Sequence, residues 1–291
     1  MHVVFGANGR AGGETARALL ERGEAVRIVV RRPEQGEPWE TLGAEVAIAS
    51  IDDVGAVSAA LKGATSAFLL NPPPVAGDPF ERAAEIGAAL AKAVRQVRLK
   101  KAVVLSSVGA QHASGTGIIA TLHQIESALA GAAPTTAFLR PGYFVETWTE
   151  VAEAAVAEGM LPTFLEPGQK IPMVSTVDVG RAAARLMGED WTGTRIVELG
   201  GPEDWSARDV ATAFADVLGR PVAPAFVPPE QRAAVLAEAG LPPAVATALL
   251  GMYDGIASGR VAPADDSEHR RGTTSLVTAV ARIVTKIQAA A

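Results

Sequence analysis

The chain has 291 residues, 48% hydrophobic and 20% charged, which is enough to bury one large core and a smaller second lobe. Its formal net charge of -6 argues against nucleic acid or an anionic membrane surface as the main partner. The absence of cysteine excludes disulfides, thiolate metal sites and cysteine nucleophiles, and no His, Asp and Glu cluster has metal-ligand spacing. We therefore expect no metal.

The N-terminus begins directly with a strand pattern and shows no charged and apolar leader. The longest uncharged stretch, residues 102–125, is interrupted by Ser, Gly, His and Gln, which argues against a membrane span. We expect a cytoplasmic protein.

The first predicted elements are a strand, a glycine turn and a helix. Residues 3–5 are apolar, and residues 14–22 have the periodicity of an amphipathic helix. Between them the spacing G-x-x-G-x-x-G places glycines at Gly6, Gly9 and Gly12. In a dinucleotide-binding turn, such glycines allow the bend, let backbone N–H groups approach a pyrophosphate and let helix and strand pack closely.

The second predicted strand, residues 25–30, ends in Arg31 and Arg32 instead of an acidic residue. An Asp or Glu there would hydrogen-bond the ribose 2′-hydroxyl of NAD, whereas an arginine pair suits the 2′-phosphate of NADP. The alternative is a solvated basic strand end. We predict NADP(H) as the cofactor, with NAD(H) as the second choice.

Short apolar strands alternate with helices as far as residue 141. Further strands are expected at 44–49, 67–70, 102–106 and 135–139, with helices at 54–62, 78–97 and 118–129. This alternation predicts an α/β fold, a doubly wound parallel Rossmann sheet with strand order 3-2-1-4-5-6. In such a sheet the ligand lies beyond the carboxyl ends of the strands.

The rhythm changes after about residue 145. Residues 1–145 are predicted to form an NAD(P)-binding Rossmann domain, and 146–291 a smaller, mostly helical C-terminal substrate lobe. Segments near 172–200 are expected to return to the Rossmann sheet, since 195–199 has the pattern of a further strand.

Five motifs, in order along nearly the whole chain, resemble those of the NmrA-like atypical short-chain dehydrogenase/reductases. They are VFGANGRAG at 4–12, SSVGA at 106–110, HQIE at 123–126, LRPGYFVE at 139–146 and IPMV at 171–174. The resemblance implies a Rossmann fold with a small substrate lobe. It also implies one of two activities: NAD(P)H-dependent reduction of quinones, or dinucleotide binding in a redox sensor or transcriptional co-regulator.

The resemblance also implies which positions bind the cofactor. The glycine turn would cradle the pyrophosphate, Arg31 would take the 2′-phosphate, and Ser50, where family members often carry Asp, would lie near the adenine. The residues expected to bind the cofactor are Gly6, Asn8, Gly9, Arg10, Ala11, Arg31, Ser50, Ile51, Asn71, Pro72, Ser106, Pro141, Tyr143 and Phe144.

The chain departs from short-chain dehydrogenases at the catalytic Tyr-x-x-x-Lys pair, because His123 and Ser127 stand at those two places. A quinone delocalises incoming charge, so one histidine could polarise or protonate its oxygen. The predicted catalytic residues are His123, Ser106 and Glu126, with Glu126 one helical turn on and able to orient the imidazole. The alternatives are a histidine satisfied in helix–sheet packing and a solvated glutamate.

These inferences predict an NADPH-dependent oxidoreductase that transfers hydride to a small-molecule quinone-like or other conjugated acceptor, such as an enone, imine or azo compound. The alternative is a non-catalytic NAD(P)(H)-binding redox sensor that acts through a protein partner. Monomer and homodimer both stay open.

Overall fold

Eight parallel strands form the central sheet of the computed structural model, which describes residues 1–290. In spatial order they are β13 (Glu268–Arg271), β10 (Gly193–Gly200), β6 (Thr135–Pro141), β5 (Lys101–Leu105), β4 (Ser66–Leu69), β1 (His2–Phe5), β2 (Val26–Val30) and β3 (Glu45–Ile48). The predicted order 3-2-1-4-5-6 is confirmed from β3 to β6. The further strand expected at 195–199 is present in β10, which joins the sheet beside β6.

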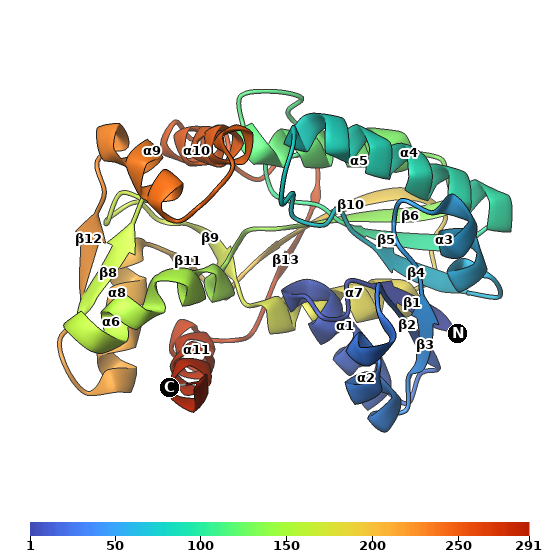
Figure 1. The fold of residues 1–291 in the computed structure, drawn as a ribbon, viewed down its shortest axis with the longest axis horizontal. Helices are drawn as coiled ribbons and strands as arrows, with labels where there is room; N and C mark the ends of the chain where they lie inside the picture. The colour runs from blue at the N-terminus through green and yellow to red at the C-terminus, as the bar shows by residue number, and fades with distance from the viewer. Residues whose placement is uncertain (291) are drawn as a thin grey trace.

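Helices cover both faces of this sheet, as Figure 1 shows. One layer contains α1 (Arg10–Glu21), α2 (Glu37–Thr41) and α7 (Thr176–Gly188), and the other α3 (Val54–Leu61), α4 (Pro79–Val97) and α5 (Ala120–Leu129). Val3 and Val4 are both fully buried although neighbouring side chains in a strand point to opposite faces. Burial on both faces explains why these strands are continuous apolar runs instead of alternating ones.

The edge strand β13 was not predicted, because its sequence, EHRR, has no apolar pattern. Ion pairs hold it in place. Glu268 accepts from Arg195 of β10 at 2.6 Å, and Arg270 pairs with Glu189 at 3.0 Å. The strand is therefore anchored both by parallel pairing with β10 and by charges that lie far away in the sequence.

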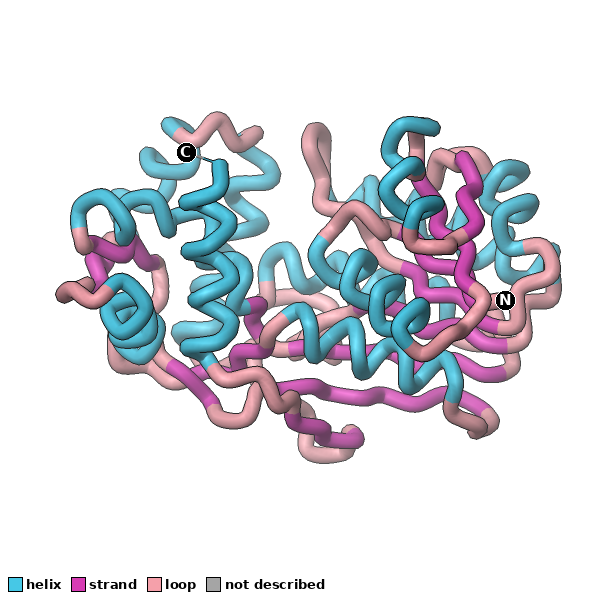
Figure 2. The backbone as a smooth tube through the Cα atoms, turned by 90° about the horizontal axis from the view of Figure 1, so that it is seen from below, coloured by secondary structure: helices cyan, strands magenta, loops and turns pink. Residues whose placement is uncertain are grey.

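The smaller lobe gathers at one end of the sheet, opposite the amino-terminus (Figure 2). Its helices are α6 (Ala152–Glu158), α8 (Ala207–Leu218), α9 (Pro229–Glu238), α10 (Pro243–Ala257) and α11 (Leu276–Ala290). Two short sheets accompany them: β11 (Asp204–Trp205), β9 (Ile171–Val174) and β7 (Tyr143–Phe144) in one, β12 (Ala223–Phe226) and β8 (Met160–Thr163) in the other. Among residues 1–290, no helix has the length and apolar character needed to cross a membrane.

Two glycines bring α1 close to its neighbours. A Cβ atom at Gly12 would overlap the carbonyl oxygen of Gly6, so the helix lies directly on the turn after β1. A Cβ atom at Gly180 of α7 would overlap the backbone of Glu14 in α1. The helix that begins at the glycine turn is thus fixed from two sides without any intervening side chain.

We expect Gly180→Ala to lower the free energy of unfolding by about 1–3 kcal/mol, because the added methyl group must push α7 away from α1. Denaturant unfolding of the purified variant measures this change. Gly168→Ala is the matched control, since a Cβ there would meet its nearest neighbour, Arg208, at 3.9 Å, and its cost should stay within about 0.5 kcal/mol. Equal stability of the two variants would contradict the close packing.

Candidate active site

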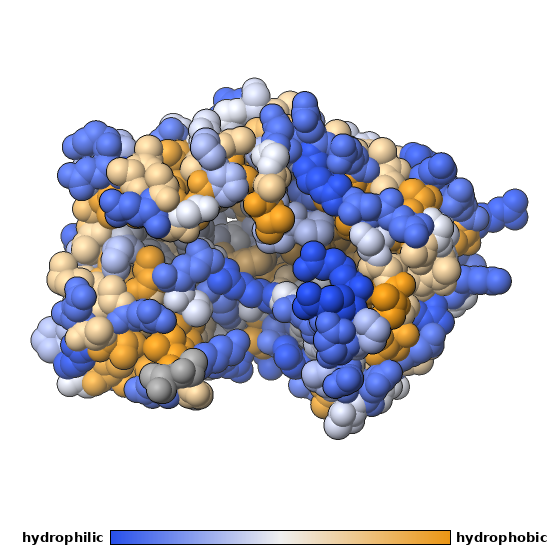
Figure 3. Space-filling view, viewed as in Figure 1, coloured by the Kyte–Doolittle hydropathy of each residue, from blue (hydrophilic) through white to orange (hydrophobic). Residues whose placement is uncertain are grey.

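A cavity of about 680 Å³ lies at the carboxyl ends of the central strands. On the sheet side, the wall is formed by residues at or just after the carboxyl ends of β1, β4, β5 and β6. These residues include Arg10, Ala11, Asn71, Pro72, Ser106, Pro141, Tyr143 and Phe144. Helix α10 of the smaller lobe supplies Leu249, Met252, Tyr253 and Ile256. The molecule is hollowed between the two lobes (Figure 3). This size is typical of small-molecule sites.

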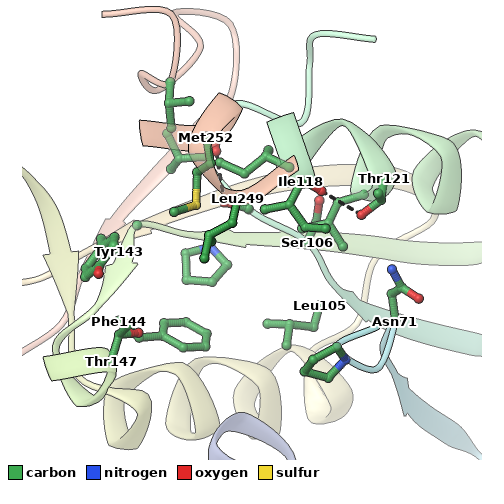
Figure 4. Close-up of a pocket in the computed structure, with 18 of the residues that line it drawn as sticks. Asn71, Leu105, Ser106, Ile118, Thr121, Tyr143, Phe144, Thr147, Leu249 and Met252 are labelled. Carbon is green, nitrogen blue, oxygen red and sulfur yellow. Dashed lines mark hydrogen bonds between the residues drawn. The ribbon is translucent and has the colours of Figure 1, made fainter. Parts of the chain in front are cut away.

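Apolar side chains dominate the middle of the cavity. In Figure 4 the ring of Phe144 extends toward Leu105, with Leu249 and Met252 above it. Asn71 and Tyr143 lie at opposite ends of the same view. The cavity is therefore an apolar slot with polar groups at its ends.

The glycine turn has the geometry of an anion site. Gly6 adopts the left-handed conformation, with φ of +67°, and its carbonyl accepts from the N–H of Gly9 at 2.8 Å. Gly9 is the N-cap of α1, and it has no side chain to occupy the free N–H groups of the first turn. These N–H groups and the helix dipole are suited to a phosphate.

The side chain of Asn8 is occupied by the protein. Its Nδ2 donates to the carbonyl of Gln35 at 3.1 Å, and its Oδ1 accepts from Trp39 Nε1 at 2.9 Å. We therefore assign this side chain to holding the glycine turn against residues 35–39. Only its backbone is left to approach the pyrophosphate, as the sequence predicted for the turn as a whole.

Arg31 lies at the exposed end of β2, and among the described residues its guanidinium has no carboxylate partner. Arg32 differs, because its Nε pairs with Glu34 at 2.7 Å. The side chain of Gln35 accepts from the backbone N–H groups of both arginines, at 3.2 and 3.1 Å, and so fixes the strand end. Arg31 remains available for an anion.

Ser50 and Ile51, which were predicted to lie near the adenine, come after β3 at the same edge of the sheet. They do not line the cavity. Ser50 donates to Asp52 at 3.2 Å, and Ile51 packs against the core between the sheet and α3.

Asn71 carries an unsatisfied atom. Its Oδ1 is buried and has no hydrogen-bond partner within residues 1–290, and the residue lines the cavity. A buried carbonyl oxygen without a donor costs about 1–3 kcal/mol. A carboxamide or ribose hydroxyl of a bound dinucleotide would supply that donor, so the residues present fit the expected cofactor.

A buried ion cluster lies behind the cavity wall. Ser106 Oγ donates to Glu126 Oε1 at 2.5 Å, and Arg140 binds both oxygens of Glu126, at 2.8 and 2.7 Å. Arg140 also lies 3.7 Å from Glu198, and all four residues are at most 8% exposed. Burial raises the pKa of Glu198. Burial acts to lower the pKa of Arg140, but its bonds to Glu126 and the charges of both carboxylates raise it overall.

This cluster corrects the expectations for Glu126. It neither orients His123 nor lies in solvent, because Arg140 and Ser106 occupy its carboxylate. The sequence offered no signal for this pairing, since Arg140 ends a strand predicted from its apolar residues alone.

His123 lies outside the cavity lining. Its Nδ1–H donates to the carbonyl of Ala110 at 2.9 Å, while its neighbours Thr121 and Leu122 line the cavity. The placement matches the packing alternative and not the expected proton donor. His123 is thus bonded to the loop before the short 3₁₀ turn η2 (Gly117–Ile119), which precedes α5.

Helix α10 approaches the cavity through glycine. A Cβ atom at Gly117 in η2 would overlap the carbonyl oxygen of Ala248, and one at Gly251 would lie 3.0 Å from Cα of Gly117. The backbones of η2 and α10 therefore meet directly. Sequence reasoning missed the four lining residues of α10, because nothing in its pattern distinguishes a cavity wall from a core face.

Comparison with known proteins identifies the family, since the model of the NmrA-like family matches residues 2–270. The chain belongs to the NmrA-like family. Its NmrA-like relatives include the NAD(P)H azoreductase of Xenophilus azovorans, 24% identical over 253 residues that cover 87% of this chain and 86% of that protein.

Two further similarities concern reductases. A (4-alkanoyl-5-oxo-2,5-dihydrofuran-3-yl)methyl phosphate reductase of Streptomyces griseus is 31% identical over 224 residues, 76% of this chain and 75% of that protein. The solved structure of the NADPH-dependent quinone oxidoreductase 2 of Escherichia coli, complexed with NADPH, aligns with a TM-score of 0.80. It is 25% identical, and the alignment covers 99% of this chain and 100% of that one.

Arg140→Leu is expected to lower the free energy of unfolding by about 3–5 kcal/mol, because it leaves Glu126 and Glu198 buried without a cation. Denaturant unfolding at neutral pH provides the measurement. Arg82→Leu is the control, since Arg82 is 35% exposed and pairs with the exposed Asp52 and Glu85, so its loss should cost under about 1 kcal/mol. Similar costs for both variants would argue against a structural role for the buried cluster.

Proposed function

We propose that this protein is an NADPH-dependent oxidoreductase that transfers a hydride to a quinone-like or other conjugated acceptor. The observation that carries the proposal is the apolar cavity at the carboxyl ends of the strands. It extends from Arg10 and Ala11, at the N-terminus of α1, to the side chains of α10. One end suits a dinucleotide and the other a flat apolar molecule.

The residues that would hold NADPH are distributed along the sheet edge. The N–H groups of Arg10 and Ala11, in the first turn of α1, would bind the pyrophosphate, and Arg31 the 2′-phosphate. Asn71, through its unpaired Oδ1, would accept from the nicotinamide or its ribose. When bound, the reduced nicotinamide supplies a hydride, which carries two electrons.

The protein favours an acceptor that tolerates incoming charge. Tyr-x-x-x-Lys is absent, so the ammonium-supported phenolate of simple ketone reduction cannot form. A quinone, azo compound or enone spreads the charge over a conjugated system and requires less from the site. Azo and quinone acceptors appear in the names of two NmrA-like relatives, which supports this choice.

The first measurement is NADPH oxidation by the purified protein with 1,4-benzoquinone, followed by absorbance after NADPH binding has been established. We expect turnover of about 1 s⁻¹ or faster. NADPH binding without turnover of benzoquinone, an azo dye or an enone would contradict the proposal. That result would favour the redox sensor that acts through a protein partner.

Arg31→Ala should weaken NADPH binding about 10- to 100-fold, because a charge-assisted bond to the 2′-phosphate is lost. Titration calorimetry with NADPH and NADH measures the effect, and NADH affinity should not change. Arg32→Ala is the matched control, since Glu34 already pairs with Arg32, and its NADPH affinity should fall about threefold or less. An unchanged NADPH affinity in Arg31→Ala would contradict the 2′-phosphate assignment.

A further inference from the structure

We propose that Tyr143 and Tyr253 form a phenol pair that donates the hydrogen bond and the proton to the acceptor. This inference rests on the proposed function and adds the group that replaces the missing catalytic tyrosine. It also narrows the preferred acceptors to those whose reduction leaves negative charge on an oxygen or nitrogen atom.

The two tyrosines are the only ones in the chain, and they meet in the cavity. Tyr143 comes from β7 and Tyr253 from α10, and their hydroxyl oxygens are 3.2 Å apart. One hydroxyl donates to the other, so one phenolic hydrogen is left over. Among the residues that the structure describes, no other group accepts from either phenol.

Three other hydroxyls of the cavity wall donate their hydrogens to protein acceptors. Ser106 donates to Glu126, Ser107 to the carbonyl of Val108 at 2.9 Å, and Thr121 to the carbonyl of Ile118 at 2.7 Å. The last of these bonds is drawn in Figure 4. Toward a bound molecule these three oxygens can therefore act only as acceptors.

The remaining polar groups of the wall do not deliver a proton at neutral pH. The guanidinium of Arg10 does not deprotonate, and it is paired with Glu150 at 3.0 Å. The amide of Asn71 and the hydroxyl of Thr147 are far weaker acids than a phenol, and the carboxylate of Glu150 is an acceptor. Within the wall formed by residues 1–290, the phenol pair alone combines a free hydrogen with an oxygen more acidic than that of an alcohol.

The surroundings of the pair keep it in place and protonated. The ring of Tyr143 lies 6.2 Å from that of Trp148, and the ring of Tyr253 packs edge-on against Phe164 at 5.1 Å. Burial raises the pKa of both phenols, and the charge of Glu150 acts in the same direction. The positive charge of Arg10 lowers the pKa of Tyr143, and that of Arg232 lowers the pKa of Tyr253, but burial outweighs both.

For a quinone, the hydride and the proton come from two different donors. A bound reduced nicotinamide would supply the hydride, with a C–H bond of its ring broken and the ring oxidised by two electrons. The hydride would form a C–H or O–H bond on the quinone and leave a negative charge on a quinone oxygen. The free phenol hydrogen bonds to that oxygen, and its O–H bond breaks as the proton passes over. The resulting phenolate accepts a hydrogen bond from its partner and recovers a proton from solvent. The acceptor has then gained one hydride and one proton.

The test uses Tyr143→Phe, Tyr253→Phe and the double variant, which keep the rings and remove the hydroxyls. We expect kcat/KM for 1,4-benzoquinone to fall about 100-fold in each single variant. The double variant should be at most about threefold slower than either single variant, because the pair acts as a unit. Tyr253→Phe should bind NADPH within about twofold of wild type. Ser127→Ala, on the solvent side of α5, is the matched control and should keep wild-type turnover.

A second acceptor separates proton delivery from packing. A triarylmethyl cation such as malachite green becomes neutral when it receives a hydride, so it needs no proton. The tyrosine variants should therefore reduce this dye at rates close to wild type while losing quinone turnover. An equal loss with both acceptors would assign the phenols a packing role and overturn the inference.

Two other outcomes are decisive. A wild-type protein that binds NADPH but reduces neither acceptor would overturn the proposed function and this inference with it. If the double phenylalanine variant reduces benzoquinone as fast as the wild-type protein, the inference is overturned and the proposed function stands. If His123→Ala loses turnover and the phenylalanine variants keep it in full, the proton donor is His123 and the inference is overturned.

Discussion

The guanidinium of Arg140, held between the carboxylates of Glu126 and Glu198, is the contact on which the geometry of the site depends. It joins the end of β6 to helix α5 and to strand β10, and the bond from Ser106 adds the end of β5. A buried cation between two carboxylates gains little net stability over apolar packing, but losing one partner is costly. The arrangement therefore strongly favours a single position for these elements. The loops that follow β5 and β6, which form much of the cavity wall, begin from this fixed point.

The rest of the cavity is formed by two parts of the chain, the sheet and helix α10, which would contact different parts of a bound ligand. The sheet supplies the glycine turn, Arg31 and Asn71, which suit a nucleotide of constant structure. Helix α10 supplies Leu249, Met252 and Tyr253, which face whatever occupies the apolar end. Under the proposed function, substitutions in this one helix would change the acceptor and leave the dinucleotide half as it is.

The sequence was sufficient for features that are local. Apolar runs located the strands β1 to β6, their alternation with helices predicted the strand order, and the glycine spacing placed the turn before α1. Features that rest on distant partners were missed or misassigned. β13 has a charged sequence and forms ion pairs with Arg195 and Glu189. Glu126 is paired with Arg140, and His123 is bonded to the carbonyl of Ala110. Tyr143 and Tyr253 meet across 110 positions, a contact that neither spacing nor periodicity encodes.

The direct contact between the backbones of η2 and α10 at Gly117 and Gly251 has a consequence for the width of the cavity. Ile118 and Ile119, next to Gly117, and Leu249 and Met252, next to Gly251, line the cavity. Because no side chain separates the two backbones, a methyl group added at Gly117 would push α10 away from η2 and shift the lining side chains of both elements.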